Sequence, residues 1–167
     1  MRIRLEPLGP QHGPEILAGQ DEALALEIIG RPWTAASLEV FLARCAHWRA
    51  DGPLRELAAL ETGSGRLLGG GGLNRHAPGL ARDQVALTYW LLADARGRGL
   101  GVELAAGMLG RAGSMPGVRE AVLLIDPANA ASQACARRIG ARLTGEWAPH
   151  PAGRGRTAER WVAALGE

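Results

Sequence analysis

An apolar run that leads into a glycine-rich turn constrains the fold of this chain more than any other feature. Val85 to Leu92 is aliphatic and aromatic, which is typical of a central strand, and a turn with three glycines follows it. Gly99 to Gly113 then has the apolar spacing of a helix, with Leu104 and Met108 on its inner face. A turn of this kind directs backbone N–H groups outward at the positive end of a helix dipole. The segment therefore predicts an anion-binding site.

The remaining pattern alternates helices and strands around this segment. We expect a strand near residues 3–8, helices at 14–29 and from Thr34 to Cys45, a hairpin of 54–61 and 66–73, a strand at 118–125, a helix at 129–139, and strands at 141–147 and 156–165. The sheet must be mixed, because helices join the central strands whereas the early strands form a hairpin. The Gly69 to Gly72 run is unusual inside a strand, and it would let a backbone or ligand approach closely.

Length and composition exclude several classes of protein. With 167 residues, 47% hydrophobic and 22% charged, residues 1–167 have the size and composition of one globular domain. No apolar run approaches the roughly 20 residues that span a bilayer, so we expect no membrane association. A net charge of +2 without interleaved basic and aromatic residues argues against nucleic-acid binding.

The basic residues and cysteines narrow the chemistry further. All 19 basic residues are arginine, which excludes Schiff-base catalysis and a P-loop lysine. Cys45 and Cys135 show neither a disulfide framework nor metal-ligand spacing, so we expect no metal site. Together with an N-terminus that lacks a signal peptide, this cysteine usage predicts a cytoplasmic protein.

Two motifs identify the anion. The Rossmann fingerprint fails because Val102 stands where its third glycine belongs, whereas R-x-x-G-x-G is present at Arg96, Gly99 and Gly101. This motif resembles the acetyl-CoA pyrophosphate loop of the GNAT superfamily of N-acetyltransferases. A second motif, N-x-x-S from Asn129 to Ser132, is similar to that of the RimJ/RimL-like branch. Together the two motifs cover residues 85 to 147.

The resemblance implies a fold and a cosubstrate. It implies an α/β GNAT fold with a mixed, mostly antiparallel sheet of about six to seven strands, about four flanking helices and splayed parallel strands at the centre. Acetyl-CoA would bind across the splay, with its pantetheine arm added to an exposed strand edge. The residues expected to bind it are Leu91, Leu92, Arg96, Gly97, Arg98, Gly99, Leu100, Gly101, Asn129 and Ser132.

The catalytic groups are less clearly marked. A main-chain N–H near Leu91 or Leu92 would polarise the thioester carbonyl. Many relatives use a tyrosine seven residues after the asparagine as the acid; this chain has Ala136 there, and its only tyrosine is Tyr89, so tyrosine is excluded from that role. Ser132 would then protonate or hydrogen-bond the CoA thiolate, or only cap its helix.

The base is open among several residues. His150 and Glu146 are the leading candidates, with Asp94 and His76 as further ones, and proton loss through water is the remaining option.

The expected activity is transfer of an acetyl group to a primary amine, either a small molecule or a protein N-terminus. The amine would enter between the N-terminal helices and the loop at 148–156, beside Trp33 and Trp147, while Trp48, Trp90 and Trp161 pack in the core. Four acidic residues on the first helix, Glu15, Asp21, Glu22 and Glu27, suit a cationic acceptor. The alternative is a CoA-binding sensor without turnover. A homodimer is also expected from the resemblance.

Overall fold

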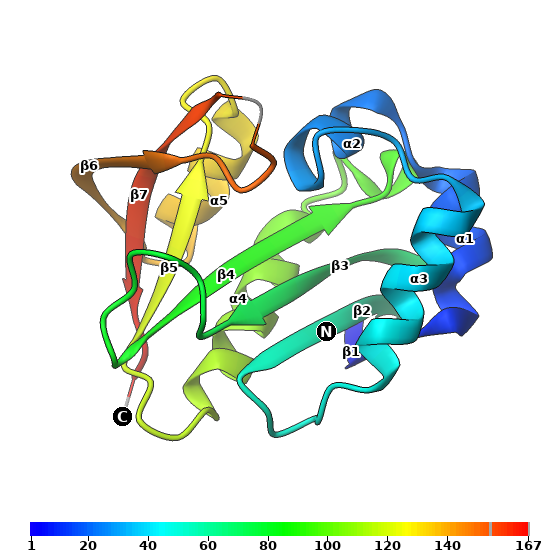
Figure 1. Ribbon diagram of the computed structural model, residues 1–167, viewed down its shortest axis with the longest axis horizontal. Helices are drawn as coiled ribbons and strands as arrows, with labels where there is room; N and C mark the ends of the chain where they lie inside the picture. The colour runs from blue at the N-terminus through cyan, green and yellow to red at the C-terminus, as the bar shows by residue number, and fades with distance from the viewer. Residues whose placement is uncertain (154, 167) are drawn as a thin grey trace.

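The computed structural model describes residues 1–153 and 155–166, and it contains a sheet with the strand order β1-β2-β3-β4-β5-β7-β6 (Figure 1). The strands are β1 (Ile3–Pro7), β2 (Leu54–Glu61), β3 (Leu67–Asn74), β4 (Gln84–Leu91), β5 (Glu120–Ile125), β6 (Arg142–Pro149) and β7 (Thr157–Ala164). The α-helices are α1 (Gly13–Gly19), α2 (Glu22–Ile28), α3 (Ala35–Ala46), α4 (Leu100–Gly113) and α5 (Ala130–Arg138), with 3-10 turns η1 (Pro10–His12) and η2 (Ala93–Ala95).

The sheet is mixed, as predicted. Neighbouring strands pair antiparallel except for β4 and β5, which pair parallel. The α/β fold class predicted from the sequence is therefore confirmed, with one helix more than expected. No helix in the described part of the chain has both the length and the hydropathy to cross a membrane.

Helices cover both faces of the sheet and create two apolar clusters. On one face, α4 packs through Leu104 and Met108 against residues such as Leu73 and Leu87 of the sheet. On the other face, Ile16 of α1, Leu24 of α2 and Leu38 and Leu42 of α3 pack over Ala58 and Leu60. Alternate residues of a strand point to opposite faces, so even-numbered residues of β2 face α1 and α3.

The helix predicted over residues 14–29 is two helices instead of one. Gln20 and Asp21 are extended between α1 and α2, and the Asp21 carboxylate accepts a hydrogen bond from the Leu24 N–H at 2.9 Å. Aspartate is a favoured N-cap because its side chain satisfies a free N–H of the first turn. The apolar spacing continues across this break, which is why the pattern alone predicted one helix. The break turns α2 toward the centre of the sheet.

The glycine run in β3 leaves room for side chains from neighbouring elements. A Cβ on Gly71 would lie 2.9 Å from the Met108 methyl group, and one on Gly70 would lie 2.6 Å from the Trp90 ring. A Cβ on Gly72 would lie 2.4 Å from a carboxylate oxygen of Glu56. Close approach therefore explains these glycines, and the Gly72 contact lies on the face that carries the site described next.

Candidate functional site

The central strands separate and open a cavity. β4 and β5 are in register only from Gln84 to Ala86, opposite Glu120 to Val122, and beyond that they diverge (Figure 1). A cavity of about 600 Å³ lies at the divergence, between the two strands, the helices α1 to α3, the start of α5 and residues 148–151. Its size is typical of sites for small molecules. The cavity is where the acceptor was expected to enter.

The glycine-rich turn forms the start of α4. Gly97 and Gly99 both have a φ of 72°, which is the left-handed region that glycine adopts without strain. Gly99 is the N-cap of α4 and offers no side chain to the free N–H groups of the first turn. These N–H groups and the helix dipole together suit a phosphate group.

The two arginines of the turn have different surroundings. The Arg96 guanidinium holds Asp21 through two hydrogen bonds of 2.6 and 2.9 Å, and it also donates to the Leu91 carbonyl at 3.0 and 3.1 Å. It thus ties α2 to the end of β4. Arg98 has an ion pair with Glu61 at 3.0 Å, and both of these side chains are partly exposed. Arg98 is therefore the freer of the two to meet an anion.

The amides at the end of β4 can be assigned to opposite sides. The Leu92 N–H donates to the Leu68 carbonyl at 2.9 Å, so it is not available to a thioester. Successive amides along a strand point to alternate sides, and the Leu91 N–H therefore points away from β3, toward the opening beside β5. Of the two N–H groups predicted to polarise the thioester, this geometry leaves Leu91.

Asn129 and Ser132 lie at the start of α5, on the cavity. The Asn129 side chain caps the helix by accepting from the Ser132 N–H at 3.0 Å, and its amide donates to Glu27 at 3.2 Å. The Ser132 hydroxyl lies 3.0 Å from the Tyr89 hydroxyl, and burial raises the pKa of Tyr89 well above its ordinary value. Tyr89 therefore stays protonated at neutral pH and can donate a hydrogen bond.

Tyr89 is a residue that the sequence reasoning missed. Tyrosine was excluded because the helical position expected to carry it is Ala136, which is fully buried here. Tyr89 instead reaches Ser132 from β4. Because side chains alternate along a strand, the sequence puts Tyr89 on the opposite face of β4 from Thr88 and Trp90. Only the divergence of β4 and β5 shows what the Tyr89 side chain faces.

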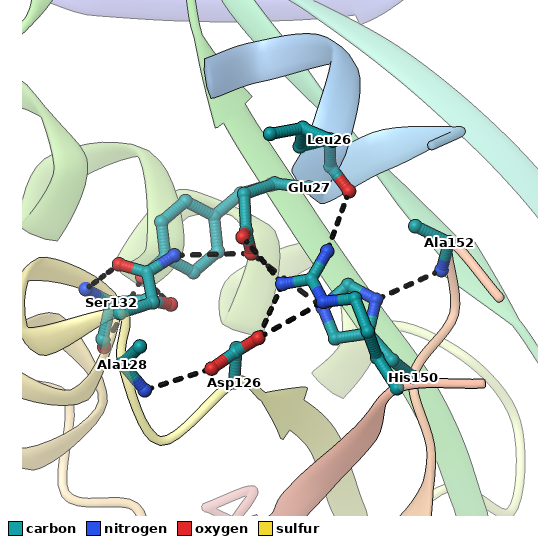
Figure 2. Close-up of polar contacts among 10 residues, drawn as sticks. Leu26, Glu27, Asp126, Ala128, Ser132, His150 and Ala152 are labelled. Atoms are coloured by element: carbon teal, nitrogen blue, oxygen red, sulfur yellow. Dashed lines mark hydrogen bonds and ion pairs between the residues drawn. The ribbon is translucent and has the colours of Figure 1, made fainter. Parts of the chain in front are cut away.

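His150 is buried and belongs to an ionic cluster at the rim of the cavity (Figure 2). Its Nδ1 accepts from the Ala152 N–H at 3.1 Å, and its Nε2 lies 3.6 Å from a Glu27 oxygen. Arg156 donates to Glu27 at 3.0 Å and to Asp126, and its hydrogen bond to Asp126 holds the pKa of that carboxyl below its usual range. The cluster joins His150 and Arg156 to α2 and to the residue that follows β5.

The ligand atoms of Glu27, Asp126 and His150 lie within 4.8 Å of one another, a spacing that a metal ion could use. The Arg156 guanidinium, however, donates to both carboxylates (Figure 2). The Arg156 guanidinium therefore supplies the positive charge between the two carboxylates of this cluster.

Three other candidate bases are not among the residues that line the cavity. Glu146 is on β6, is largely exposed and pairs with Arg160 at 3.2 Å beside a different hollow. Asp94 pairs with Arg66, and His76 lies in an exposed loop. Trp33 lines the cavity as predicted, but Trp147 is 58% exposed and lies outside it. Trp90, predicted to be a packing residue, lines the cavity as well.

Most of the acidic residues predicted to attract a cationic acceptor already have hydrogen-bond or ion-pair partners within the protein. Glu15 accepts from the Leu67 N–H at 2.9 Å, Asp21 holds Arg96, and Glu27 holds Arg156. A different carboxylate, Glu56 of β2, lines the cavity and was not singled out from the sequence. A lone glutamate in a strand gives no local signal of its surroundings.

Comparisons with known proteins agree with this fold. A family profile described as an acetyltransferase (GNAT) domain matches residues 2–142. No curated protein was found to match the sequence. Among solved structures, a spermidine N-acetyltransferase from Vibrio cholerae in complex with CoA and spermine has a TM-score of 0.79 at 14% identity, covering 98% of this chain and 96% of that one.

Two further structures share the fold. A protein assigned as a ribosomal-protein-serine acetyltransferase from Vibrio cholerae has a TM-score of 0.80 at 18% identity, covering 98% of this chain and 94% of that one. A phosphinothricin acetyltransferase from Sinorhizobium meliloti, in complex with acetyl-CoA, has a TM-score of 0.74 at 21% identity, covering 100% and 90%.

Proposed function

Because the chain belongs to the GNAT family of acetyltransferases, we propose that it transfers the acetyl group of acetyl-CoA to the nitrogen of a small primary amine. The observation that carries the proposal is the cavity at the divergence of β4 and β5, with the Tyr89 and Ser132 hydroxyls on one side and a carboxylate on the other. The thioester supplies the activated acetyl group. The solved structures with bound CoA, acetyl-CoA and spermine support this reading.

The turn before α4 is the proposed site for the CoA diphosphate. N–H groups from Leu100 onward have no side-chain cap, and Gly97 and Gly99 let phosphate oxygens approach the backbone. The exposed edge of β4 beyond Ala86 is free to pair with the amide groups of the pantetheine arm. The Leu91 N–H would then donate to the thioester oxygen as negative charge develops on it.

The proposed acid is the Tyr89 and Ser132 pair. When the amine nitrogen has attacked the carbonyl carbon, the C–S bond breaks and the departing sulfur needs a proton. Both hydroxyls lie at the cavity and are in hydrogen-bonding contact, so one can donate while the other stabilises the resulting oxygen. Asn129 holds the first turn of α5, and with it Ser132, in place.

A protein N-terminus is the second candidate acceptor. The N-x-x-S motif at Asn129 to Ser132 and the similarity to the ribosomal-protein-serine acetyltransferase favour it. The small-molecule acceptor is preferred because apolar and aromatic side chains, including Trp33, Phe41 and Trp90, line the cavity, and its volume suits a compact molecule.

The test is release of CoA thiol from acetyl-CoA in the presence of separate amines. Phenethylamine, hexylamine, spermidine and a short peptide with a free N-terminal serine represent the acceptor classes. Acetylated product with at least one of them supports the proposal. If CoA binds but none of the acceptors is acetylated, the alternative of a CoA-binding sensor without turnover is supported instead.

The location and assembly of the protein are also proposals. Cys45 and Cys135 are both free thiols, which supports a reducing compartment such as the cytoplasm. β6 is at the edge of the sheet and carries the exposed side chains of Leu143 and Trp147, which supports a homodimer. Sedimentation of the purified chain measures the latter directly.

A further inference from the structure

The Glu56 carboxylate lies over β3, one strand away from the opening in the sheet. Glu56 pairs with Gly72, and Gly72 pairs with Thr88 of β4, so the three residues form a row across the sheet. The glutamate side chain occupies the space that a side chain on Gly72 would fill. Because neighbouring strands are about 4.8 Å apart, the carboxylate lies roughly one strand spacing from β4.

This carboxylate has no polar partner within residues 1–153 and 155–166. The backbone carbonyl of Glu56 accepts from the Leu8 N–H at 2.9 Å, but the Glu56 side chain makes neither a hydrogen bond nor an ion pair with the described residues. Burial raises the pKa of Glu56 to about 7. A part-buried carboxylate without a partner, on the wall of a cavity, is unfavourable for stability and needs another explanation.

Two other titratable groups near the cavity, Cys45 and Tyr89, keep their protons at neutral pH. Cys45 of α3 faces Glu56, and burial together with the Glu56 charge raises the pKa of the Cys45 thiol to about 12. Tyr89 also remains protonated. Both Glu27 oxygens are engaged, one with Arg156 and the other with Asn129 and His150. Among the described residues that line the cavity, Glu56 is thus the one open carboxylate.

We propose that Glu56 binds the ammonium group of the acceptor and removes its proton before acetyl transfer, and that the acceptor is a monoamine with an apolar body. The inference rests on the proposed function and adds the base and the substrate class to it. Because Glu56 is the one open carboxylate among the described residues that line the cavity, the cavity can pair with one ammonium group, which favours a monoamine. The wall around Glu56 is apolar, with Leu8, Leu38 and Phe41 lining the same cavity.

The proton transfer balances without a further reactant. One N–H bond of the ammonium breaks, its proton joins a Glu56 oxygen, and the lone pair left on nitrogen forms the new bond to the carbonyl carbon. The thiolate takes a proton from the Tyr89 and Ser132 pair, and the second proton of the nitrogen, lost as the amide forms, passes through solvent to restore the proton of that pair. A base whose pKa is close to the working pH is the most effective at such a step.

Two variants test the role of the carboxylate. Glu56→Gln removes the base, and Gly72→Ala keeps the base but introduces a methyl group 2.4 Å from its present oxygen position. With phenethylamine at pH 7, we expect Glu56→Gln to lower kcat/KM about 100-fold. The KM for acetyl-CoA should not change. Gly72→Ala should lower kcat/KM as well, with the same unchanged KM for acetyl-CoA.

The pH profile separates a base from an anchor. For the wild type, kcat/KM should rise with pH through a step near pH 7, and Glu56→Gln should lose that step and recover activity only at alkaline pH. Glu39→Gln, an exposed change on α3, and Gly110→Ala, at a position with open space, are the matched controls and should behave like the wild type. Circular dichroism and CoA titration establish that each variant is folded.

Three results would overturn the inference while leaving the proposed function intact. They are a wild-type profile without a step between pH 6 and 8, a Glu56→Gln variant that retains the wild-type profile, or a preference for spermidine over phenethylamine and hexylamine. The first and third results are measured on the wild type, so the inference can be overturned even if a variant fails to fold. Failure of the proposed function looks different, since the wild type then acetylates no acceptor.

Discussion

The hydroxyl of Tyr89 lies 3.0 Å from the hydroxyl of Ser132, and this contact joins β4 to the first turn of α5 across the opening between β4 and β5. The two side chains come from elements that are neighbours only because the parallel pair diverges. The contact therefore places two hydroxyl groups at the cavity, where the proposed mechanism needs a proton donor for the departing sulfur. Cys135, one turn further along α5, also lies near the tyrosine.

Removal of either hydroxyl should slow turnover without weakening cosubstrate binding. We expect Tyr89→Phe and Ser132→Ala each to lower kcat by about tenfold to 100-fold, because the thiolate loses a proton donor or its hydrogen-bonded partner. The double variant should be little worse than the poorer single variant, since the two groups act together. Steady-state kinetics and calorimetric CoA titration measure both quantities.

Ser114→Ala is the control for loss of a serine hydroxyl, because Ser114 is at the far end of α4 and its hydroxyl donates to the Arg111 carbonyl. Unchanged turnover in Ser132→Ala would limit Ser132 to its place in the helix cap. Unchanged turnover in Tyr89→Phe would remove the tyrosine from the mechanism.

A negative side chain in the turn before α4 should prevent CoA binding. Gly99→Asp introduces a carboxylate where the diphosphate is proposed to bind, and it strains a residue whose φ is 72°. Gly117→Asp is a matched control, since Gly117 has a φ of 71°, open space around it and a position beyond the other end of α4. Calorimetry should detect CoA binding to the control and none to Gly99→Asp. Equal affinity for the two variants would contradict the placement of the diphosphate.

The pKa of Glu56 predicts how stability changes with pH. In the unfolded chain this carboxyl ionises near pH 4.5, whereas in the folded protein it ionises at about 7. Between these values the folded state holds more protons, so the free energy of unfolding falls as pH rises, by up to about 3 kcal/mol above pH 7. Glu56→Gln lacks this loss.

The stability of Glu56→Gln relative to the wild type should therefore increase from pH 4.5 to pH 8. Urea unfolding at pH 4.5, 6 and 8 measures the difference, and the exposed Glu39→Gln change should give a difference that stays constant. A Glu56→Gln difference that is also constant would mean that the Glu56 carboxyl ionises normally in the folded state.

The strands and the α4 turn could be predicted because their signals are local. Val85 to Leu92 is apolar throughout, and the glycines around Gly99 mark a backbone that needs a positive φ. The break at Asp21 was missed because apolar spacing continues through it. A favourable N-cap can divide a helix without changing its hydrophobic pattern.

The site residues depend on contacts between distant segments, and those contacts could not be predicted. Tyr89 was excluded by its position in the chain, although the fold brings it to Ser132. The position of the Glu56 side chain depends on Gly72, sixteen residues away, which leaves open the space that this side chain occupies. His150 stays a predicted candidate base; it lines the cavity, and its contact with Glu27 joins segments that are far apart in the sequence.

Substitutions of the two arginines of the turn should have different effects. The change at Arg96 should lower the stability of the protein, and the change at Arg98 should lower its affinity for CoA. Arg96→Met leaves Asp21 and the Leu91 carbonyl without their partner, and we expect the free energy of unfolding to fall by about 1–2 kcal/mol, a value reduced for partial exposure. The Arg96 guanidinium lowers the pKa of Asp21, so this contribution is present above the ordinary aspartate pKa and is lost as pH falls through the lowered one.

Arg98→Met should behave in the opposite way. Its ion pair with Glu61 is partly exposed and contributes at most about 1 kcal/mol, so unfolding should change little. CoA affinity should fall several-fold at low ionic strength, and the deficit should shrink in 0.5 M salt if the arginine acts through its charge, because salt screens exposed charges. Thermal unfolding and CoA titration of both variants provide the comparison. Weaker CoA binding by Arg96→Met with unchanged unfolding would instead make Arg96 the phosphate ligand and would remove its structural role.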